Sequence, residues 1–346
     1  MLLAIKNRID TELNRFILDL DSLYSLNKIS PLLFKSIKEF ILRKGKRVRP
    51  TLLIISYLGF APRIAPNLYR TAISLELLHD FMLVHDDIID KSATRRGKPS
   101  MHEVFNKYLK GSNNRKFSGE DLAIVSGDVM YAMAIHAFLS VKENLYRKEL
   151  ALKKFSEAAF YTGGGEFLEL LCGLKSIERM SKEDIYKIYD LKTANYTFAS
   201  PLSIGAILAG ASKKQVDIIF NYGLYLGRAF QVKDDITGMF ETEKKIGKST
   251  LTDLQEAKKT LLIWYAYHNS GNKNKRIIKR IFSKNTVTKA DLVKIRNIIL
   301  RSKALDYTKS EVALLRKKAE TLIKLSLIKP EYRNALTAYA NKIIDL

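Results

Sequence analysis

Long apolar segments with helical spacing constrain the fold of this chain more than any other feature. TLLIISYLGF follows Pro50, and RTAISLELLHDFMLVHDDIID and AIVSGDVMYAMAIHAFLSV come after it along the chain. Proline favours the first turn of a helix, and apolar residues three and four positions apart form one buried face. Glycine and proline, 17 and 7 of 346 residues, are rarer than in an average chain, and alternating strand patterns are scarce. The sequence therefore predicts an all-α protein.

Two polar segments, residues 110–120 and 270–276, interrupt the helical pattern. Their glycine, serine and asparagine residues are typical of loops. Neither segment is long enough to link separate domains, so we expect a single domain over residues 1–346.

The composition excludes several classes of protein. The net charge is +23, but the lysines are spread along the chain and the aromatic residues lie in apolar runs. This arrangement offers no stacking platform, so we expect no nucleic-acid partner. The single cysteine, Cys172, excludes an intramolecular disulfide and fits a cytoplasmic protein. Asp128 interrupts the longest apolar region, residues 122–141, so we expect no transmembrane segment.

Two aspartate pairs end apolar helical segments. LVHDDIID contains Asp86, Asp87 and Asp90, and FQVKDDITG contains Asp234 and Asp235. Asp86 and Asp90 share one helix face, where like charges destabilise a helix unless a cation binds them. Clustered carboxylate oxygens favour a hard cation such as Mg²⁺. Facing helices could aim both sets into one cavity, although an exposed acidic helix end is the alternative for the first.

Basic residues near these aspartates suggest an anionic substrate. GKRVRP, residues 45–50, is a basic loop that leads into a helix N-terminus, a common anion site. Arg95 and Arg96 follow the first aspartates, and guanidinium groups suit phosphate oxygens. A solvated surface is the alternative for each of the lysines that follow, Lys192, Lys248 and Lys258.

The motifs together resemble those of the trans-isoprenyl diphosphate synthases, the polyprenyl synthetase family. GKRVRP, LVHDDIIDKSATRRGKPS, LKTA, FQVKDDITG and GKSTLTDLQEAKKT occur in the family's order between about residues 45 and 260. The resemblance implies the isoprenoid synthase fold, a helical bundle around a central apolar cavity, and a homodimer. It also implies a Mg²⁺-dependent, head-to-tail condensation of an allylic diphosphate with isopentenyl diphosphate to a short-chain trans-prenyl diphosphate.

The resemblance assigns roles to individual residues. All five aspartates would bind Mg²⁺: Asp86, Asp87, Asp90, Asp234 and Asp235. Four basic residues would bind the allylic diphosphate: Arg95, Lys192, Lys248 and Lys258. Four others would bind isopentenyl diphosphate: Lys46, Arg49, His79 and Arg96.

The remaining roles concern the reacting carbons and the length of the product. Thr193 and Gln231 would lie near the reacting carbons, where their dipoles can stabilise a carbocation. Phe81 and Met82, about one turn before Asp86, would form the floor that stops elongation. An aromatic residue followed by flexible Met82 favours a twenty-carbon product, with fifteen carbons next. The alternative is that Phe81 belongs to the core.

The sequence departs from the family pattern at four positions. Gly238 stands where the second motif commonly ends in aspartate, and Lys44 replaces the first of two glycines. Glu166 and Glu169 stand where glutamine and aspartate are common, and one of them could support Lys192.

Two other functions remain as alternatives. A class I terpene cyclase also uses aspartate-rich helices, but GKRVRP and Arg96 would then bind a second diphosphate that the reaction lacks. A catalytically silent partner subunit of a prenyl synthase is the second alternative, supported by Gly238 and Glu166.

Overall fold

The computed structural model describes residues 1–111, 116–242 and 250–345, and most of these residues lie in helices. The chain divides into two compact units. The N-terminal unit comprises Met1–Phe155 and Ile204–Ala211, and the C-terminal unit comprises Ser156–Ser203 and Ser212–Leu346. The single domain expected over residues 1–346 stays a prediction beside this division.

The N-terminal unit contains seven described helices and a short hairpin before α8 begins. They are α1 (Leu2–Tyr24), α2 (Leu26–Ile29), α3 (Pro31–Ile41), α4 (Val48–Phe60), α5 (Leu68–Ile89), β1 (Thr94–Arg95), β2 (Lys98–Pro99), α6 (Met101–Tyr108) and α7 (Gly119–Phe138). Helix α8 (Leu145–Leu174) begins in this unit, and α10 (Ser200–Leu208) ends in it.

In the described part of the C-terminal unit, all regular secondary structure is helical. It contains η1 (Ile177–Arg179), α9 (Lys182–Tyr189), η2 (Asp190–Ala199), α11 (Lys213–Phe240), α13 (Thr252–Gln255), α14 (Leu261–His268), α15 (Asn272–Phe282), α16 (Lys289–Arg301), α17 (Ala304–Leu325) and α18 (Pro330–Ile344).

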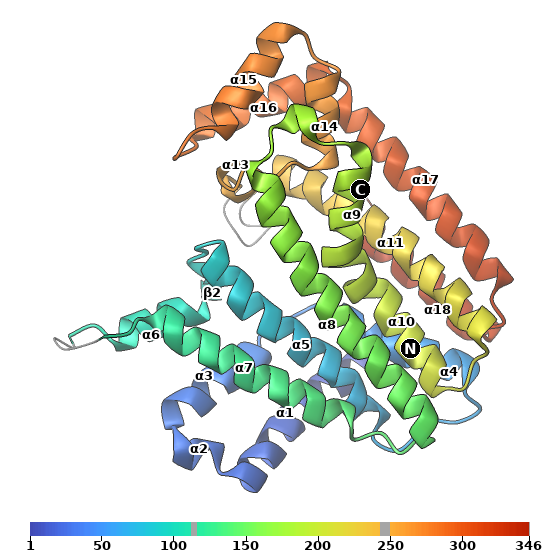
Figure 1. Cartoon of the computed structure of the whole chain (residues 1–346). Helices are drawn as coiled ribbons and strands as arrows, with labels where there is room; N and C mark the ends of the chain where they lie inside the picture. The colour runs from blue at the N-terminus through green and yellow to red at the C-terminus, as the bar shows by residue number, and fades with distance from the viewer. Residues whose placement is uncertain (112–115, 243–249, 346) are drawn as a thin grey trace. The chain divides into compact units, whose positions relative to one another are not determined.

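Helices α5 and α7 lie side by side in the N-terminal unit (Figure 1). Helix α5 is buried on most sides, with Leu75, Leu77 and Leu78 fully inaccessible. Burial on most sides explains why apolar residues occur around most of this helix and not in a single stripe. The aspartates of the first motif therefore stand at the C-terminal end of a rigid core helix.

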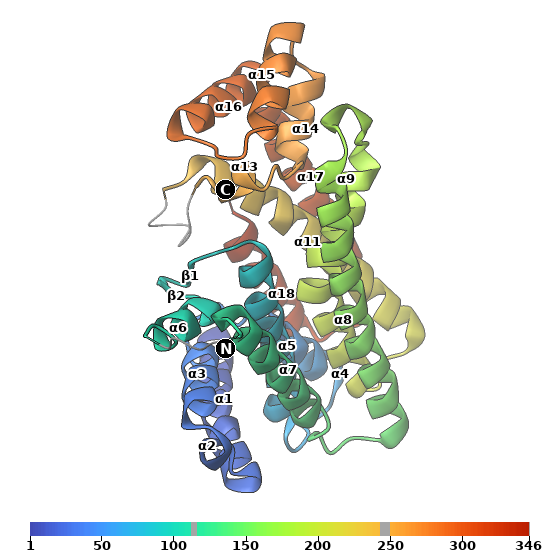
Figure 2. The ribbon, with the colours of Figure 1, turned by 60° about the vertical axis from the view of Figure 1, so that its left-hand side comes forward.

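In the C-terminal unit, α11 packs along both α17 and η2 (Figure 2). Helix η2 is π-helical and carries Lys192 and Thr193. A Cβ atom at Gly227 of α11 would lie 2.4 Å from the Cα of Ala194, so only glycine permits this approach of the two backbones. The aspartates of the second motif lie near the C-terminal end of α11 and thus beside η2.

The all-α prediction is confirmed, with one small exception among the described residues. Strands β1 and β2 form an antiparallel hairpin of two residues each. The turn between them consists of Arg96 and Gly97, which have φ values of 55° and 74°. Positive φ at both central residues is the geometry that matches the twist of a tight hairpin.

Two helix boundaries differ from the expected loops. Helix α15 begins at Asn272, inside the segment 270–276, and α7 begins at Gly119, inside 110–120. Ser118 and Asp121 form a capping box at the start of α7. Ile278 and Ile281 of α15 are buried, and this packing stabilises a helix that includes the polar first turn.

Within the described residues, α7 is the single helix long and apolar enough to cross a bilayer by length and composition, and 44% of its most apolar window is buried. Core helices of folded proteins meet the same criterion. Packing of α7 against α5 agrees with a core role.

Candidate functional site

The first aspartate cluster contains one buried and two partly exposed carboxylates. Asp87 is 0% exposed, and its Oδ1 accepts hydrogen bonds from Nε of Arg95, at 2.8 Å, and from Nη2. Its Oδ2 is buried without a hydrogen-bond partner in the described structure. Burial raises the pKa of Asp87, although the bonds and charge of Arg95 oppose this rise. Asp86 and Asp90 are partly exposed.

Arg43 fixes the hairpin that carries Arg95 and Arg96. Its guanidinium donates to the carbonyl of Arg95 at 3.2 Å and to that of Pro99 at 2.9 Å. The same group pairs with Glu39 of α3 at 2.8 Å. Both strands of the hairpin are thereby anchored to α3, which limits where the two arginine side chains can reach.

Arg96 approaches a second, deeper set of carboxylates on α5. Its Nη2 lies 3.4 Å from Oδ1 of Asp80 and 3.7 Å from Oε1 of Glu76. Glu76 is already bound by Nη1 of Arg47 at 2.7 Å, and Asp80 is the nearer of the two carboxyl groups to Arg96. Arg47 also donates to Asp10 at 2.8 Å and to the carbonyl of Arg43 at 2.9 Å. Arg47 is therefore fully engaged in shaping the basic loop.

The other residues predicted to bind isopentenyl diphosphate lie in the same unit. Lys46 is exposed, whereas Arg49 and His79 are partly buried. Burial lowers the pKa of His79 well below its ordinary value, and the charges of Arg49 and Arg96 lower it further. Burial also raises the pKa of Asp80 to about 8, while Arg96 opposes that rise. At neutral pH the side chain of His79 is therefore uncharged.

Phe81 and Met82 are partly exposed and lie outside the fully buried core. The ring of Phe81 lies 5.2 Å from that of Tyr131 on α7 and 4.7 Å from that of His85, measured between centroids. Phe81 thus forms an aromatic contact between α5 and α7, about one helical turn before Asp86.

In the C-terminal unit, Lys192 is bound by both glutamates at which the sequence departs from the family pattern. Its Nζ pairs with Oε2 of Glu166 and, at 2.6 Å, with Oε2 of Glu169. Burial opposes ionisation of Glu169, but the charges of Lys192 and Lys258 lower its pKa overall. A Cβ atom at Gly165 would lie 2.7 Å from the backbone nitrogen of Lys192, so glycine allows α8 to pass this close to η2.

A chain of hydrogen bonds joins Thr193 to the second aspartate pair. Thr193 donates to Oε1 of Gln231 at 2.7 Å, and Nε2 of Gln231 donates to Oδ1 of Asp235 at 2.9 Å. The hydroxyl of Tyr189 donates to Oδ2 of Asp235 and accepts from the backbone of Leu261 at 2.9 Å. Asp235 is 8% exposed, and burial raises its pKa well above the ordinary value.

Asp234 is exposed, and a third carboxylate stands near the end of the same helix. A Cβ atom at Gly238 would lie 2.8 Å from Oδ2 of Asp253, so a side chain there would displace this carboxylate. Nζ of Lys258 lies 2.7 Å from Glu256 and 3.9 Å from Asp253. Lys248, predicted to bind the allylic diphosphate, lies outside the described residues.

The aspartates of the two motifs fit Mg²⁺, which binds few protein ligands, better than they fit a metal ion whose ligands all come from the protein. Among residues 1–111, 116–242 and 250–345, no three acidic, histidine or cysteine side chains converge as a complete cage. Magnesium is usually held by one or two carboxylates and completed by water and substrate phosphates. Asp86 and Asp90, one turn apart and partly exposed, and the exposed Asp234 offer such hard oxygen donors. That both aspartate sets face one cavity stays a prediction.

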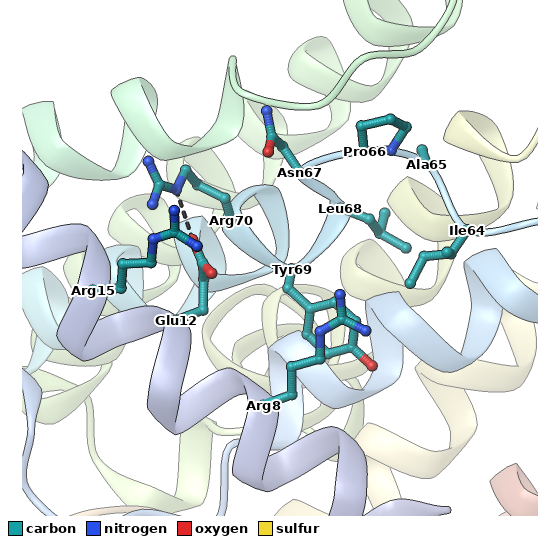
Figure 3. A pocket seen from close by; sticks show the side chains of 10 residues that line it. All are labelled: Arg8, Glu12, Arg15, Ile64, Ala65, Pro66, Asn67, Leu68, Tyr69 and Arg70. Carbon is teal, nitrogen blue, oxygen red and sulfur yellow. Dashed lines mark hydrogen bonds and ion pairs between the residues drawn. The ribbon is translucent and has the colours of Figure 1, made fainter.

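A surface pocket of about 430 Å³ lies at the opposite end of α5 (Figure 3). Arg70, on its wall, stands sixteen residues before Asp86, or about 24 Å along the helix. Its charge is balanced by Glu12 at 2.6 Å and Asp19 at 2.5 Å, and Arg8 lies 4.1 Å from the centre of the Tyr69 ring. None of the predicted site residues lines this pocket.

Sequence reasoning missed several residues that hold the site together. Arg43, Glu76, Asp80, Tyr189 and Asp253 bind or adjoin predicted site residues in the structure. Glu76 and Asp80 gave a usable signal, because two acids four residues apart in an apolar helix require burial with a counter-charge. Tyr189 gave none, since a tyrosine in an amphipathic segment is ordinary.

An all-helical fold, with aspartates at helix ends and arginines beside them, defines a class of enzymes that act on diphosphates. Residues 30–299 match the sequence profile of the family described as polyprenyl synthetase. The short chain isoprenyl diphosphate synthase of Methanocaldococcus jannaschii is 31% identical over 284 residues, which cover 81% of this chain and 77% of that protein. The geranylfarnesyl diphosphate synthase of Aeropyrum pernix is 31% identical over 307 residues, covering 87% and 90%.

A solved structure agrees with the sequence comparison. Geranylgeranyl pyrophosphate synthase from Corynebacterium glutamicum, crystallised with isoprenyl diphosphate and magnesium, gives a TM-score of 0.91 at 25% identity, covering 100% of this chain and 99% of that one. The chain belongs to the polyprenyl synthetase family. The family resemblance and the isoprenoid synthase fold inferred from the sequence are confirmed, and the chain is an enzyme of the short-chain trans-prenyltransferase type.

Proposed function

We propose that this enzyme joins an allylic diphosphate to isopentenyl diphosphate and releases mainly a twenty-carbon trans-prenyl diphosphate. One observation carries the two-substrate part of the proposal. The neighbouring residues Arg95 and Arg96 pair with different carboxylates of α5, Asp87 and Asp80. These carboxylates are seven residues, or about 10 Å, apart along the helix. Two arginines fixed in this way suit two diphosphates better than one.

The arginines and lysines fall into two groups with different substrates. Lys46, Arg49, His79 and Arg96 would bind isopentenyl diphosphate, with neutral His79 supplying a hydrogen bond rather than a charge. Arg95, Lys192 and Lys258 would bind the allylic diphosphate, with Lys248 assigned to the same role from the sequence alone. The acidic partners of Lys192 hold its ammonium group in place and partly offset its charge, which prevents it from binding anions indiscriminately.

Asp86, Asp90 and Asp234 would hold Mg²⁺. When bound, the metal stabilises negative charge on the departing diphosphate. Asp87 and Asp235, which the sequence analysis places among the metal ligands, are engaged by Arg95 and by Gln231 with Tyr189. We assign them the positioning of these side chains. Asp253, next to Gly238, would supply the carboxylate that the second motif lacks.

The reacting carbons require groups that tolerate a carbocation. The hydroxyl of Thr193 and the amide of Gln231 are hydrogen-bonded to one another and through Asp235 to Tyr189. This network fixes the direction of two neutral dipoles, and preorganised dipoles stabilise developing charge. Apolar helices exclude water that would quench the cation. Proton removal is assigned to the departed diphosphate, as the family resemblance implies.

Incubation of purified protein with isopentenyl diphosphate, labelled allylic diphosphates and Mg²⁺ tests the proposal. We expect geranylgeranyl diphosphate as the main product by mass spectrometry, and no turnover in EDTA. A hydrocarbon formed from one diphosphate alone would instead establish a cyclase. Activity that appears only after addition of a homologous subunit would establish a silent partner.

Phe81 tests the length of the product. Its partly exposed ring, packed on Tyr131, supports a role as the floor beneath the growing tail. We expect Phe81→Ala to shift the product beyond twenty carbons. Phe34→Ala, which removes a partly buried ring from α3, serves as the matched control and should leave product length unchanged. A folded, active Phe81→Ala enzyme with an unchanged product would show that another side chain forms the floor.

We also propose a cytoplasmic homodimer, based on the single cysteine and on exposed apolar residues of the long helices. Phe160, Phe167 and Leu174 of α8 are 77%, 66% and 86% exposed. Large apolar side chains exposed along one helix are typical of an interface. Light scattering should give twice the chain mass of 39.5 kDa, and Phe160→Glu should shift the protein toward the monomer. A wild-type particle of 39.5 kDa at micromolar concentration would refute the dimer.

A further inference from the structure

Positive charge is concentrated in one segment of the C-terminal unit. Residues 270–303 contain eleven lysines and arginines and a single acid, Asp291. This tenth of the chain thus carries +10 of the total net charge of +23. The segment forms α15, α16 and their connections, and all of it is described by the structure.

The two helices bury their apolar faces in the same core cluster. Ile278 and Ile281 of α15 and Ile295 and Ile299 of α16 are buried there, together with residues of α14. Figures 1 and 2 both show α15 next to α16 at the end of the unit. Because the inner faces are occupied by the core, the basic side chains stand on the outer faces.

The outer faces carry cations that are not matched by acids. On α15, Lys273, Arg276 and Arg280 are exposed at positions i, i+3 and i+7, and on α16, Lys294 and Arg301 are exposed at i and i+7. Within the described chain, no carboxylate lies within ion-pair distance of these five. Two other lysines of the segment are paired, Lys279 with Glu178 and Lys284 with Asp291. Unpaired cations on adjacent helices generate a positive potential.

Apolar side chains are exposed between these cations. Val293 and Leu300 of α16 are 55% and 51% exposed and lie on one face, seven residues apart. Each is followed directly by one of the exposed cations, Lys294 and Arg301. Val293 and Leu300 do not belong to the core, because the buried residues of α16 lie on its opposite face. Exposed aliphatic residues flanked by lysine and arginine are typical of helices that rest on a membrane surface.

We propose that the outer faces of α15 and α16 dock on the surface of an anionic phospholipid bilayer. The cations would attract the acidic headgroups, and Val293 and Leu300 would enter the boundary between headgroups and acyl chains. A nucleic acid fits less well, because the one aromatic residue of the segment, Phe282, packs against the core and leaves no stacking surface. The proposal does not depend on the reaction that the enzyme catalyses.

Vesicle co-sedimentation without substrates tests this docking surface. We expect the wild-type protein to bind vesicles of phosphatidylcholine with 30% phosphatidylserine at 100 mM salt. Binding should weaken at least tenfold in 500 mM salt and be absent with phosphatidylcholine alone. Failure to bind the anionic vesicles would refute the proposal.

A matched pair of variants separates this surface from the general basicity of the chain. Arg276→Glu/Arg280→Glu/Lys294→Glu should weaken vesicle binding at least tenfold, whereas Lys213→Glu/Lys214→Glu/Lys317→Glu, on exposed parts of α11 and α17, should weaken it less than threefold. Equal losses would show that net charge alone attracts the protein to the membrane. Turnover in the absence of vesicles should be unchanged in both, so failure of the proposed reaction is distinguishable from failure of docking.

Two further measurements separate lipid insertion from simple attraction. Leu300→Ser, which leaves the charge unchanged, should weaken vesicle binding by a fewfold, and an unchanged affinity would contradict insertion. A single-stranded RNA that competes fully with vesicles at lower concentration, and binds more weakly to the triple α15–α16 variant, would overturn the proposal in favour of a nucleic-acid surface.

Discussion

The aspartate pairs of α5 and α11 have the same sequence but different surroundings. In each pair the first aspartate reaches the surface, since Asp86 is partly exposed and Asp234 is exposed, and the second is buried. Asp87 is bound by the charged guanidinium of Arg95, whereas Asp235 is bound by the neutral groups of Tyr189 and Gln231. The charge of the partner is therefore the main difference between the two regions.

This difference explains how one motif can serve two purposes. A buried carboxylate beside a cation remains ionised and holds that cation in place, whereas a buried carboxylate among neutral groups tends to keep its proton. The pKa of Asp235 is raised well above its ordinary value by burial, whereas Arg95 opposes the rise for Asp87. In the proposed function, Asp87 of the first pair holds Arg95 in place for a diphosphate, and Asp235 of the second holds the dipoles of Gln231 and Thr193.

The largest effect is expected from the accessible aspartates. Asp86→Ala and Asp234→Ala should each lower kcat by on the order of 10²–10³, the range seen when one group that stabilises transition-state charge is removed. Steady-state kinetics with saturating substrates measures this loss. Asp217→Ala, on an exposed face of the same helix as Asp234, is the control and should retain activity. Comparable kcat values for all three variants would contradict the assignment of the motifs.

A smaller effect separates the two arginines beside the first pair. Arg96→Ala should raise KM for isopentenyl diphosphate about tenfold, and Arg95→Ala should do the same for the allylic substrate, since a hydrogen bond to a charged group contributes about 1.5–3 kcal/mol. Arg95→Lys and Arg96→Lys keep the positive charge but lack the paired N–H groups of a guanidinium, so they should show a smaller rise in KM than the alanine variants. The reverse pattern of KM values would mean that the two diphosphate sites are exchanged.

The buried aspartates should differ in their contribution to stability. Asp87→Asn leaves Arg95 without its counter-charge, and we expect a loss of about 2–3 kcal/mol in the free energy of unfolding, somewhat less than for a fully buried pair because the Arg95 side chain is 23% exposed. Asp235→Asn replaces a carboxyl group among neutral partners and should cost less than about 1 kcal/mol. Urea unfolding at pH 7 compares the two. Equal losses would show that the partner's charge is unimportant.

The pH dependence of stability should sharpen the same contrast. The folded-state pKa of Asp235 is raised above the unfolded value, so the folded protein keeps a proton that the unfolded chain releases above about pH 4. The stability of wild type relative to Asp235→Asn should therefore fall as pH rises from about 4 toward neutrality, by at most about 1.4 kcal/mol per pH unit. Urea unfolding at pH 4.5, 6 and 7.5 measures this. A relative stability that rises with pH would contradict the raised pKa.

The accessible parts of the two regions were predictable from the sequence, and their supports were not. Both aspartate pairs stood out because they end apolar helical segments, and GKRVRP stood out because it is a basic loop that leads into a helix N-terminus. The ion pair between Asp87 and Arg95 depends on a two-residue turn in which Arg96 has a positive φ. No local sequence pattern predicts this turn. The approach of Asp253 to Gly238 joins two residues that are fifteen positions apart in the sequence. Such contacts arise from packing rather than from local pattern.

The fold shows the same limit. Helical periodicity predicted α4, α5 and α7 and the helical segment that ends with the second aspartate pair, because burial of apolar faces determines them. The same periodicity misplaced the start of α15. The first turn of this helix is polar and has the composition of a loop, and it is helical because the isoleucines that follow pack into the core. The division of the chain into two compact units had no clear sequence signal, since two of its three boundaries fall inside α8 and α10 and the third falls in the short connection between α10 and α11.

The central claim is that the first aspartate of each pair binds Mg²⁺ and the second positions neighbouring side chains. The most direct test is the Mg²⁺ concentration that gives half-maximal turnover. Four variants are compared at fixed, saturating substrate: Asp86→Asn, Asp87→Asn, Asp234→Asn and Asp235→Asn. We expect Asp86→Asn and Asp234→Asn to raise this concentration at least tenfold, and Asp87→Asn and Asp235→Asn to change it less than threefold. A tenfold rise in the variants of the buried aspartates, with little change in the other two, would contradict the account.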